Sequence, residues 1–159
     1  MILPAALADL LLVVESMRPE HRRDMAAWYP DLEIDSFVAD RWNHGGMMWS
    51  MWADDVPYAV GGVGEDRPGV GTWWLIGTPS LEKHALAVVR FGRTVVNRLL
   101  ASDFHRIQAY CLEDWPAACR TAEAIGLTFE GRHPAMGVNG ENVLSYGRTR
   151  NGQSGQQRR

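Results

Sequence analysis

One turn of the sequence combines residue types that could bind an anion. It spans residues 77–84, reads Gly-Thr-Pro-Ser-Leu-Glu-Lys-His, and precedes the longest stretch with helical apolar spacing. Backbone N–H groups at the start of a helix attract negative charge, and Lys83 and His84 add positive charge there. The turn also has a single glycine, a proline without an N–H at Pro79, and a glutamate, Glu82, that repels anions. A solvated first helical turn is therefore the interpretation we favour, and an anion-binding turn is the alternative.

The histidines and cysteines do not follow a metal-binding pattern. Cys111 and Cys119 do not form a CxxC pair, and two cysteines cannot build a disulfide framework. We expect buried thiols of a cytosolic protein, and no metal site. The five histidines are scattered without ligand spacing: His21, His44, His84, His105 and His133.

Charge and hydropathy argue against two kinds of partner. The formal net charge is −3, but residues 148–159 hold four arginines and no acids. Without them the chain has 12 basic and 19 acidic residues, a formal charge of −7, which disfavours nucleic acid as the main partner. The apolar run 3–14 is interrupted by Asp9 and is too short to cross a bilayer, so no membrane partner is expected.

The length of 159 residues fits one domain, which we place at residues 1–148, followed by a disordered basic tail at 149–159. Seven tryptophans are many for this length. Core packing is the interpretation we favour, and lining of a pocket or interface is the alternative. They are Trp28, Trp42, Trp49, Trp52, Trp73, Trp74 and Trp115.

The first half of the chain predicts helices followed by strands. Apolar residues at three- and four-residue spacing predict a helix over 4–17, and Pro19 suits the first turn of a second. Turn residues at 54–55 separate two apolar runs, which predicts a hairpin. The expected elements are helices over 4–17, 19–28 (ended by Tyr29-Pro30) and 35–42 (ended by His44-Gly45-Gly46), strands over 47–53 and 56–63, and a loop over 64–71.

The second half predicts a parallel strand pair joined by a long helix. Thr78 can be the N-cap and Pro79 the first residue of this helix, and Asp114 can cap the next one. A strand–helix–strand unit over 72–112 implies a crossover between parallel neighbours. The sequence thus predicts a single α/β (α+β) domain with a mixed central sheet flanked by helices. The expected strands are 72–76, 105–112, 127–134 and 142–148, with a turn at Asn139-Gly140 and a helix from Asp114 through Ile125.

This order of elements resembles the GNAT (N-acetyltransferase) fold. The more specific similarity covers roughly residues 100–148 and lies in the segments 105–109, 122–131 and 139–142 with Tyr146, which resemble the end of the ribosomal-protein N-acetyltransferase branch. Residues 45–100 are similar more loosely. The first strand usual in this fold has no counterpart before the opening helix.

A second resemblance is to small GNAT-like proteins of tailed phages, including an internal virion protein of short-tailed phages. It lies in Trp74-Leu75-Ile76-Gly77-Thr78-Pro79, in the following Glu82-Lys83-His84, and in the early Met17-Arg18-Pro19. The similarity spans most of the chain in short motifs, and it implies a phage origin.

The GNAT resemblance implies acetyl-CoA as the cofactor. In that family main-chain groups of the central strand hold the thioester, and a glycine-rich turn holds the pyrophosphate. The family's turn pattern is Arg or Gln, two residues, Gly, one residue, then Gly or Ala, which residues 77–84 match poorly. The candidate cofactor-binding residues are therefore Trp74, Leu75, Ile76, Lys83 and His84.

The resemblance assigns no catalytic residue. The family's tyrosine acid falls near Ala122, and Asp114 replaces its asparagine, which we interpret as a helix cap. Tyr110 and Cys111 could face the site, although core packing is the favoured interpretation. Acidic residues that could flank an acceptor, with nothing to select among them, are Glu33, Asp35, Asp54 and Glu65.

Three functions follow as hypotheses. The first is an acetyl-CoA-dependent N-acetyltransferase of phage origin, acting on an amine substrate or a protein N-terminus. The second is a non-catalytic virion or assembly protein on the same scaffold, with phage structural proteins as partners. The third is a small-ligand binding module. The expected location is the host cytoplasm, or the virion for the second hypothesis.

Overall fold

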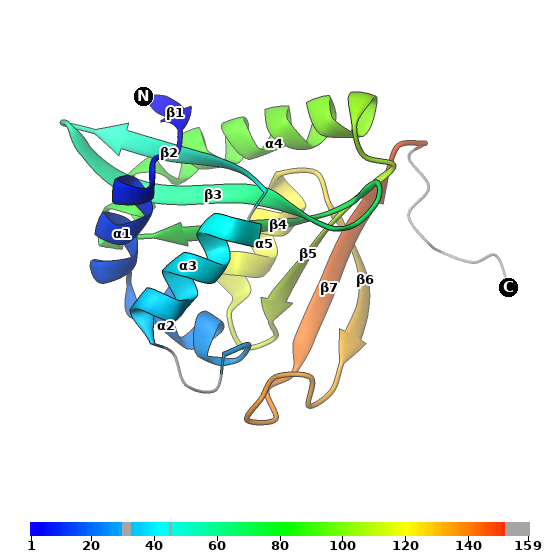
Figure 1. Cartoon of the computed structure of the whole chain (residues 1–159). Coiled ribbons are helices and arrows are strands. Elements are labelled where there is room, and N and C mark those ends of the chain that lie inside the picture. The colour runs from blue at the N-terminus through cyan, green and yellow to red at the C-terminus, as the bar shows by residue number, and fades with distance from the viewer. Residues whose placement is uncertain (30–32, 45, 152–159) are drawn as a thin grey trace, which may run out of the picture. The chain divides into compact units, whose positions relative to one another are not determined.

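The computed structural model describes residues 1–29, 33–44 and 46–151. The chain divides into two compact units, one formed by Met1–Glu65 with Trp73–Ala85 and the other by Asp66–Thr72 with Leu86–Arg159. Figure 1 shows the elements. They are β1 (Ile2–Pro4), α1 (Leu7–Glu15), α2 (Pro19–Ala26), α3 (Ile34–His44), β2 (Met47–Ala53), β3 (Val56–Arg67), β4 (Val70–Gly77), the 3₁₀ helix η1 (Pro79–His84), α4 (Ala85–Ser102), β5 (Arg106–Leu112), α5 (Pro116–Ala124), β6 (Thr128–His133) and β7 (Val143–Thr149).

Seven strands form one mixed sheet in the order β1-β2-β3-β4-β5-β7-β6. β2 pairs antiparallel with β1 and β3, and β7 pairs antiparallel with β5 and β6. β4 and β5 are parallel, with Val70 opposite Arg106 and Thr72 opposite Gln108. The predicted α/β fold with a mixed sheet flanked by helices is confirmed, as is the parallel crossover through α4.

The first unit has an apolar core between its helices and strands. The spacing in α1 places Leu10, Val13 and Val14 inward, and all three are fully buried. Asp9 accepts a hydrogen bond from the Ala6 N–H at 3.0 Å, which satisfies one of the free donors at the start of the helix. The core cluster consists of Leu10, Val13, Val14, Met17, Met25, Phe37, Val38, Val60 and Ile76.

The chain begins with a strand, which the sequence did not predict. β1 pairs with β2, with Ile2 opposite Met51, and α1 starts at Leu7 rather than at residue 4. Backbone bonds hold this strand, including the Trp52 N–H to the Met1 carbonyl at 2.8 Å. The expectation of a missing first strand is wrong because three residues are too few to show a period, and the pairing partner supplies the stability.

The loop predicted over 64–71 is also wrong. β3 continues through Arg67 and β4 begins at Val70, so that only Pro68 and Gly69 lie between the two strands. Residues 65–67 are exposed charged residues, whose composition suggests a loop although the backbone is extended. Gly69 has φ +77°, a conformation that favours glycine at the turn.

The long helix begins with a turn of different geometry. Residues 79–84 form the 3₁₀ helix η1, and the α-helix starts only at Ala85. Thr78 is the N-cap and Pro79 is the first helical residue, as predicted. The Thr78 side chain makes no capping hydrogen bond. Leu81 is buried and packs on Gly77, where an added Cβ would overlap its side chain. This contact draws the first turn inward.

The prediction that Asp114 caps α5 is wrong. The N-cap is Trp115, whose backbone is not helical (φ −119°, ψ 75°), and Pro116 is the first helical residue. Proline restricts the residue before it to non-helical conformations, so the helix boundary falls at Trp115. The Trp115 side chain is buried.

The second unit packs α4 and α5 with β5, β7 and β6. α4 buries one apolar face, with Val88, Val96 and Leu100 inside. β7 includes Thr149, and the Arg150 side chain donates to three carbonyls near the end of α4, those of Leu100, Ser102 and Phe104. Predictions on Pro30, Gly45 and residues 152–159 lie outside the described residues.

Across the described residues, none of the helices has the length and apolar character that crossing a membrane requires. The same residues contain no group of three histidine, cysteine or acidic side chains arranged to hold a metal ion.

Candidate functional site

The candidate strand segment lies at the end of β4 in the first unit. Ile76 is buried in the core cluster, and Trp74 packs against that cluster. Leu75, between them, is half-buried. The expected role of these residues is through main-chain atoms, so their side chains are free to serve packing. Their packing positions the turn that follows.

Three backbone donors of the turn after β4 already have acceptors within the protein. The Thr78 N–H donates to the Tyr58 carbonyl at 2.9 Å, and the Leu81 N–H donates to the Thr78 carbonyl at 3.0 Å. The Ala85 N–H donates to Glu82, and Pro79 has no N–H. A phosphate group would therefore not find the row of free N–H groups that a glycine-rich turn presents.

Charged side chains can take over part of the role that free backbone N–H groups have in binding a phosphate. Glu82, which should repel phosphate, pairs with Arg18 at 3.2 Å, with side-chain exposures of 74% and 11%. Lys83 is exposed, and His84 is half-buried with its ring stacked on Tyr58 at 4.5 Å between centroids. Burial raises the pKa of the Tyr58 hydroxyl, so this ring stays neutral. Lys83 and His84 therefore lie at the end of this turn, with Lys83 exposed and His84 packed on the Tyr58 ring.

His21, which the sequence did not single out, holds the start of this turn. Its ring is buried, and the Gly77 N–H and the Arg18 Nε–H both point at Nδ1 from 3.2 Å. The Gly77 carbonyl oxygen also lies 3.2 Å from Nδ1, but it already accepts the Arg18 backbone N–H at 3.1 Å. With two obligatory donors aimed at it, Nδ1 acts as the acceptor and the ring proton is on Nε2. Burial, with the Arg18 charge, lowers the pKa of His21 to about 3, so the ring is neutral.

The Trp74 side chain faces a cation from α3. The Arg41 guanidinium carbon lies 4.9 Å from the Trp74 ring centroid and 5.5 Å from that of Phe37. Arg41 also donates to the Tyr29 hydroxyl at 3.3 Å, and Tyr29 donates to Asp40 at 2.9 Å. Trp74 therefore has a packing role in the first unit, as the sequence favoured for the tryptophans as a group.

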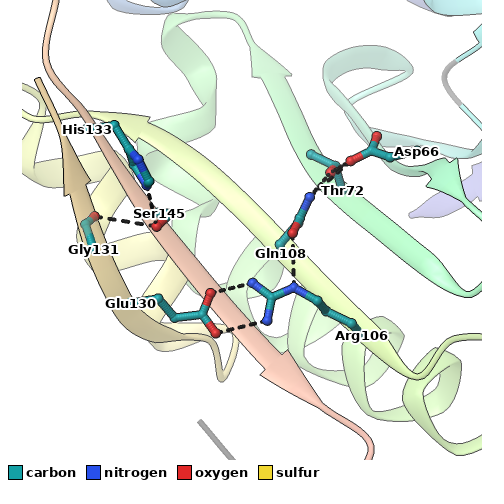
Figure 2. A network of polar contacts seen from close by, with 8 residues as sticks. All are labelled: Asp66, Thr72, Arg106, Gln108, Glu130, Gly131, His133 and Ser145. Carbon is teal, nitrogen blue, oxygen red and sulfur yellow. Dashed lines mark hydrogen bonds and ion pairs between the residues drawn. The ribbon is translucent and has the colours of Figure 1, made fainter. Parts of the chain in front are cut away.

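In the second unit, polar side chains form a row across one sheet face, which Figure 2 shows. Arg106 makes a two-bond ion pair with Glu130 and donates through Nε to Gln108 at 3.0 Å. Gln108 in turn donates to Asp66 at 3.0 Å and to Thr72 at 3.2 Å. This network joins the β3–β4 turn region to β5 and β6, and no motif indicated it because its members are far apart in the sequence.

A second polar group continues along the same face of this unit. Tyr110 follows Gln108 by two residues on β5 and lies opposite Ser145 on β7. The Ser145 hydroxyl lies 2.8 Å from Nε2 of His133, as Figure 2 shows, and the Tyr110 and His133 ring centroids are 6.4 Å apart. Tyr110 is half-buried rather than in the core, and Cys111, on the other face of β5, is buried as expected.

The remaining sequence candidates do not converge on a site. Cys119 is half-buried and donates to the Leu112 carbonyl at 3.8 Å, and neither cysteine is in a disulfide. Burial, together with a hydrogen bond to Cys119, raises the pKa of Tyr146 above its usual range. Ala122, at the place of the family's tyrosine, is buried. The four acidic candidates all have exposed side chains: Glu33, Asp35, Asp54 and Glu65.

The mixed sheet flanked by helices is the architecture of the GNAT N-acetyltransferase fold. The chain is similar to YncA from Salmonella typhimurium, solved with its cofactor acetyl-CoA (16% identity, 99% of this chain and 97% of the other, TM-score 0.68). It is similar to the ribosomal-protein-alanine N-acetyltransferase from Brucella melitensis (13%, 94% and 99%, TM-score 0.67).

A GNAT-family protein from Chromobacterium violaceum is similar over 94% of this chain and 87% of its own, at 13% identity and a TM-score of 0.70. At these low identities, the TM-scores show a shared fold and nothing beyond it. No protein-family model matches the chain, and no curated protein matches it.

Proposed function

We propose that this protein is an N-acetyltransferase that binds acetyl-CoA and transfers the acetyl group to an amine. The observation that carries the proposal is a GNAT fold over the full chain whose turn after β4 keeps Lys83 and His84 at its end while Arg18 neutralises Glu82. Similar folds support different functions, so the turn and not the fold alone is the basis.

The residues of the first unit have distinct parts in this proposal. Main-chain groups of Trp74, Leu75 and Ile76 hold the thioester arm, and Lys83 and His84 contact the phosphates. When bound, acetyl-CoA supplies an activated acetyl group on sulfur. His21 and Arg18 keep the turn in place, because both contact Gly77 and Arg18 also holds Glu82.

A direct test uses the fact that Lys83 is the only lysine in the sequence. Isothermal titration of acetyl-CoA should give micromolar or tighter binding, weakened at least about tenfold in Lys83→Ala, a loss of about 1.4 kcal/mol. Arg98→Ala, another exposed base, is the matched control. In parallel, an amine-reactive label should modify Lys83 more slowly when CoA is present. Absence of binding to the wild-type protein, with no protection of Lys83, would refute the cofactor assignment.

A second candidate function is a non-catalytic virion or assembly protein of phage origin. The observation in its favour is that the N–H groups of Thr78, Leu81 and Ala85 already have acceptors and that Pro79 has no N–H, which weakens the case for phosphate binding by this turn. This function requires the protein to be found in purified particles and its gene to lie beside portal, tail or head genes. Acetyl transfer by the purified protein, combined with its absence from particles, would exclude it.

A further inference from the structure

The charges of the protein are divided unevenly between its two compact units. The first unit, residues 1–65 with 73–85, contains 5 basic and 12 acidic residues, a formal charge of −7. The second unit, residues 66–72 with 86–159, contains 11 basic and 7 acidic residues, a formal charge of +4. The expectation that nucleic acid is not the main partner rests on a charge summed over both units, which hides this difference. Charge asymmetry within one chain is a signal of binding to nucleic acid or to a membrane surface.

Four arginines of the second unit follow α4 at intervals of about one turn. Arg90 and Arg93 belong to the helix itself and, three residues apart, share one of its faces. Arg148 on β7 reaches the helix one turn further on, where its Nη1 donates to the Asn97 side chain at 2.7 Å. Arg150 lies at the end of the helix, where it donates to three backbone carbonyls. We call these four side chains the arginine row.

The bonds that hold the arginine row use neutral acceptors and leave its charge uncompensated. Arg93 donates to the Ala124 carbonyl at 3.1 and 2.7 Å, and the other bonds go to the Asn97 amide oxygen and to backbone carbonyls. In the part of the chain that the structure describes, no carboxylate forms an ion pair with any of the four.

Two acidic residues adjoin the arginine row in the sequence and do not neutralise it. Asp103 follows the last residue of α4, and Glu123 precedes the residue whose carbonyl Arg93 contacts. Both are exposed, and the Asp103 carboxylate accepts a hydrogen bond from the Ser102 hydroxyl at 2.6 Å. A guanidinium has five N–H donors, so each arginine of the row has donors left for an anion.

The length and composition of the arginine row fit a phosphate backbone better than a protein partner. Residues 90–102 of α4 extend over roughly 18 Å, and a nucleic-acid duplex carries about one negative charge per 1.7 Å of its axis. The row consists of arginine alone, whose planar fork matches the oxygens of a phosphate group. Residues 87–128, all of which the structure describes, include no exposed large apolar side chain of the kind that anchors protein interfaces.

We infer that the arginine row of the second unit binds the phosphate backbone of a nucleic acid. Contacts to phosphates fix a strand in place and carry no sequence information directly, so we expect similar affinities for different sequences. Binding does not depend on the proposed acetyl transfer, because no residue of the row belongs to β4 or to the turn that follows it.

The test measures binding of the full chain to a fluorescent oligouridine RNA by fluorescence anisotropy at several salt concentrations. The logarithm of the association constant should fall against the logarithm of the salt concentration with a slope of about −3, because four contacts each release about 0.7 counterion from a single strand. A duplex should give a steeper slope, about −3.6. Absence of binding at low salt, or an affinity that does not change with salt, would overturn the inference.

Arg90→Glu tests the row itself, because the Arg90 side chain is exposed and makes no hydrogen bond within the described residues. It should weaken binding at low salt by about tenfold and reduce the slope by about 1. Arg22→Glu, at an exposed arginine of α2 in the first unit, changes the net charge equally and should bind like the wild type. Both variants should keep the wild-type thermal midpoint. Equal affinities of the two variants would show that the net charge, and not the row, attracts the RNA.

Two further comparisons identify the partner and separate this inference from the proposed function. Polyglutamate should displace the labelled RNA much less effectively than unlabelled RNA of equal charge. Equal displacement by polyglutamate would reject nucleic acid in favour of an acidic protein segment. RNA binding without acetyl-CoA binding would contradict only the proposed function, whereas acetyl-CoA binding without RNA binding would contradict only this inference.

Discussion

The Nδ1 atom of His21 on α2 lies 3.2 Å from the backbone nitrogen of Gly77, at the end of β4. The two residues are 56 positions apart in the sequence, and the contact is buried. It joins a helix of the first unit to the turn that carries Lys83 and His84, so a side chain of α2 positions this turn.

Replacing this histidine should therefore affect both folding and binding. In His21→Ala the buried Gly77 N–H loses its acceptor, which costs about 1–3 kcal/mol of unfolding free energy. We expect acetyl-CoA affinity to fall as well, because the turn loosens. Urea denaturation and isothermal titration measure the two effects. His44→Ala, at a histidine with 77% side-chain exposure, serves as the control, and an equal loss there would argue against a specific role for His21.

The pH dependence of stability should reflect two buried groups on α2 that act in opposite directions. His21, with its pKa lowered to about 3 from 6.5, resists the proton that the unfolded chain binds, so its contribution makes stability rise with pH between about 3 and 6.5. Burial raises the pKa of Asp24 to about 7 from 3.8, so the folded state holds a proton that the unfolded chain loses, and stability falls as pH rises from about 3.8 to 7.

Single substitutions should reveal these opposed slopes. Between about pH 4 and 6.5 the wild-type free energy of unfolding should change little through these two groups. Asp24→Asn should leave a rise with pH, and His21→Gln should leave a fall. Urea denaturation at several pH values measures this. Parallel curves for the wild type and Asp24→Asn would show that Asp24 titrates normally in the folded protein.

The ion pair between Arg106 and Glu130 should stabilise the second unit. Its side chains are 25% and 17% exposed, so solvent screens it only in part. Glu130→Gln should cost about 2 kcal/mol, because the negative charge and one of the two acceptor oxygens for Arg106 are lost. Glu113→Gln removes the similar but more exposed pair with Arg132 and should cost clearly less. Thermal unfolding of both variants tests this, and a reversed order would contradict it.

Gly69 and Gly140 form a matched pair for testing the turn before β4. Both have positive φ, +77° and +85°, so alanine at either position should cost about 1–2 kcal/mol in backbone strain. At Gly140 nothing lies within 4 Å of an added Cβ, whereas at Gly69 it would overlap the His105 ring. Gly69→Ala should therefore be the more destabilising. Equal midpoints of denaturation would mean that the His105 ring moves aside without cost.

Local periodicity was sufficient for the elements whose residues alternate regularly. The predicted strand over 47–53 coincides with β2, and the predicted long stretch with helical apolar spacing forms α4. The same signal predicted the parallel pairing of β4 and β5, since a strand, a long helix and a strand allow that crossover. Periodicity failed at β1 and at the extension of β3, where three residues or charged residues hide an extended backbone.

By itself, the sequence determined the order of elements, the mixed sheet and the turn with Lys83 and His84, because hydrophobic spacing and turn chemistry are local properties of the chain. Only the tertiary structure decided which side chains meet. The contacts of His21 with Gly77, of Arg106 with Glu130, and of His133 with Ser145 depend on strand register and helix packing. A shift of one residue in register would turn each strand side chain to the opposite face, and no local pattern specifies that choice for polar residues.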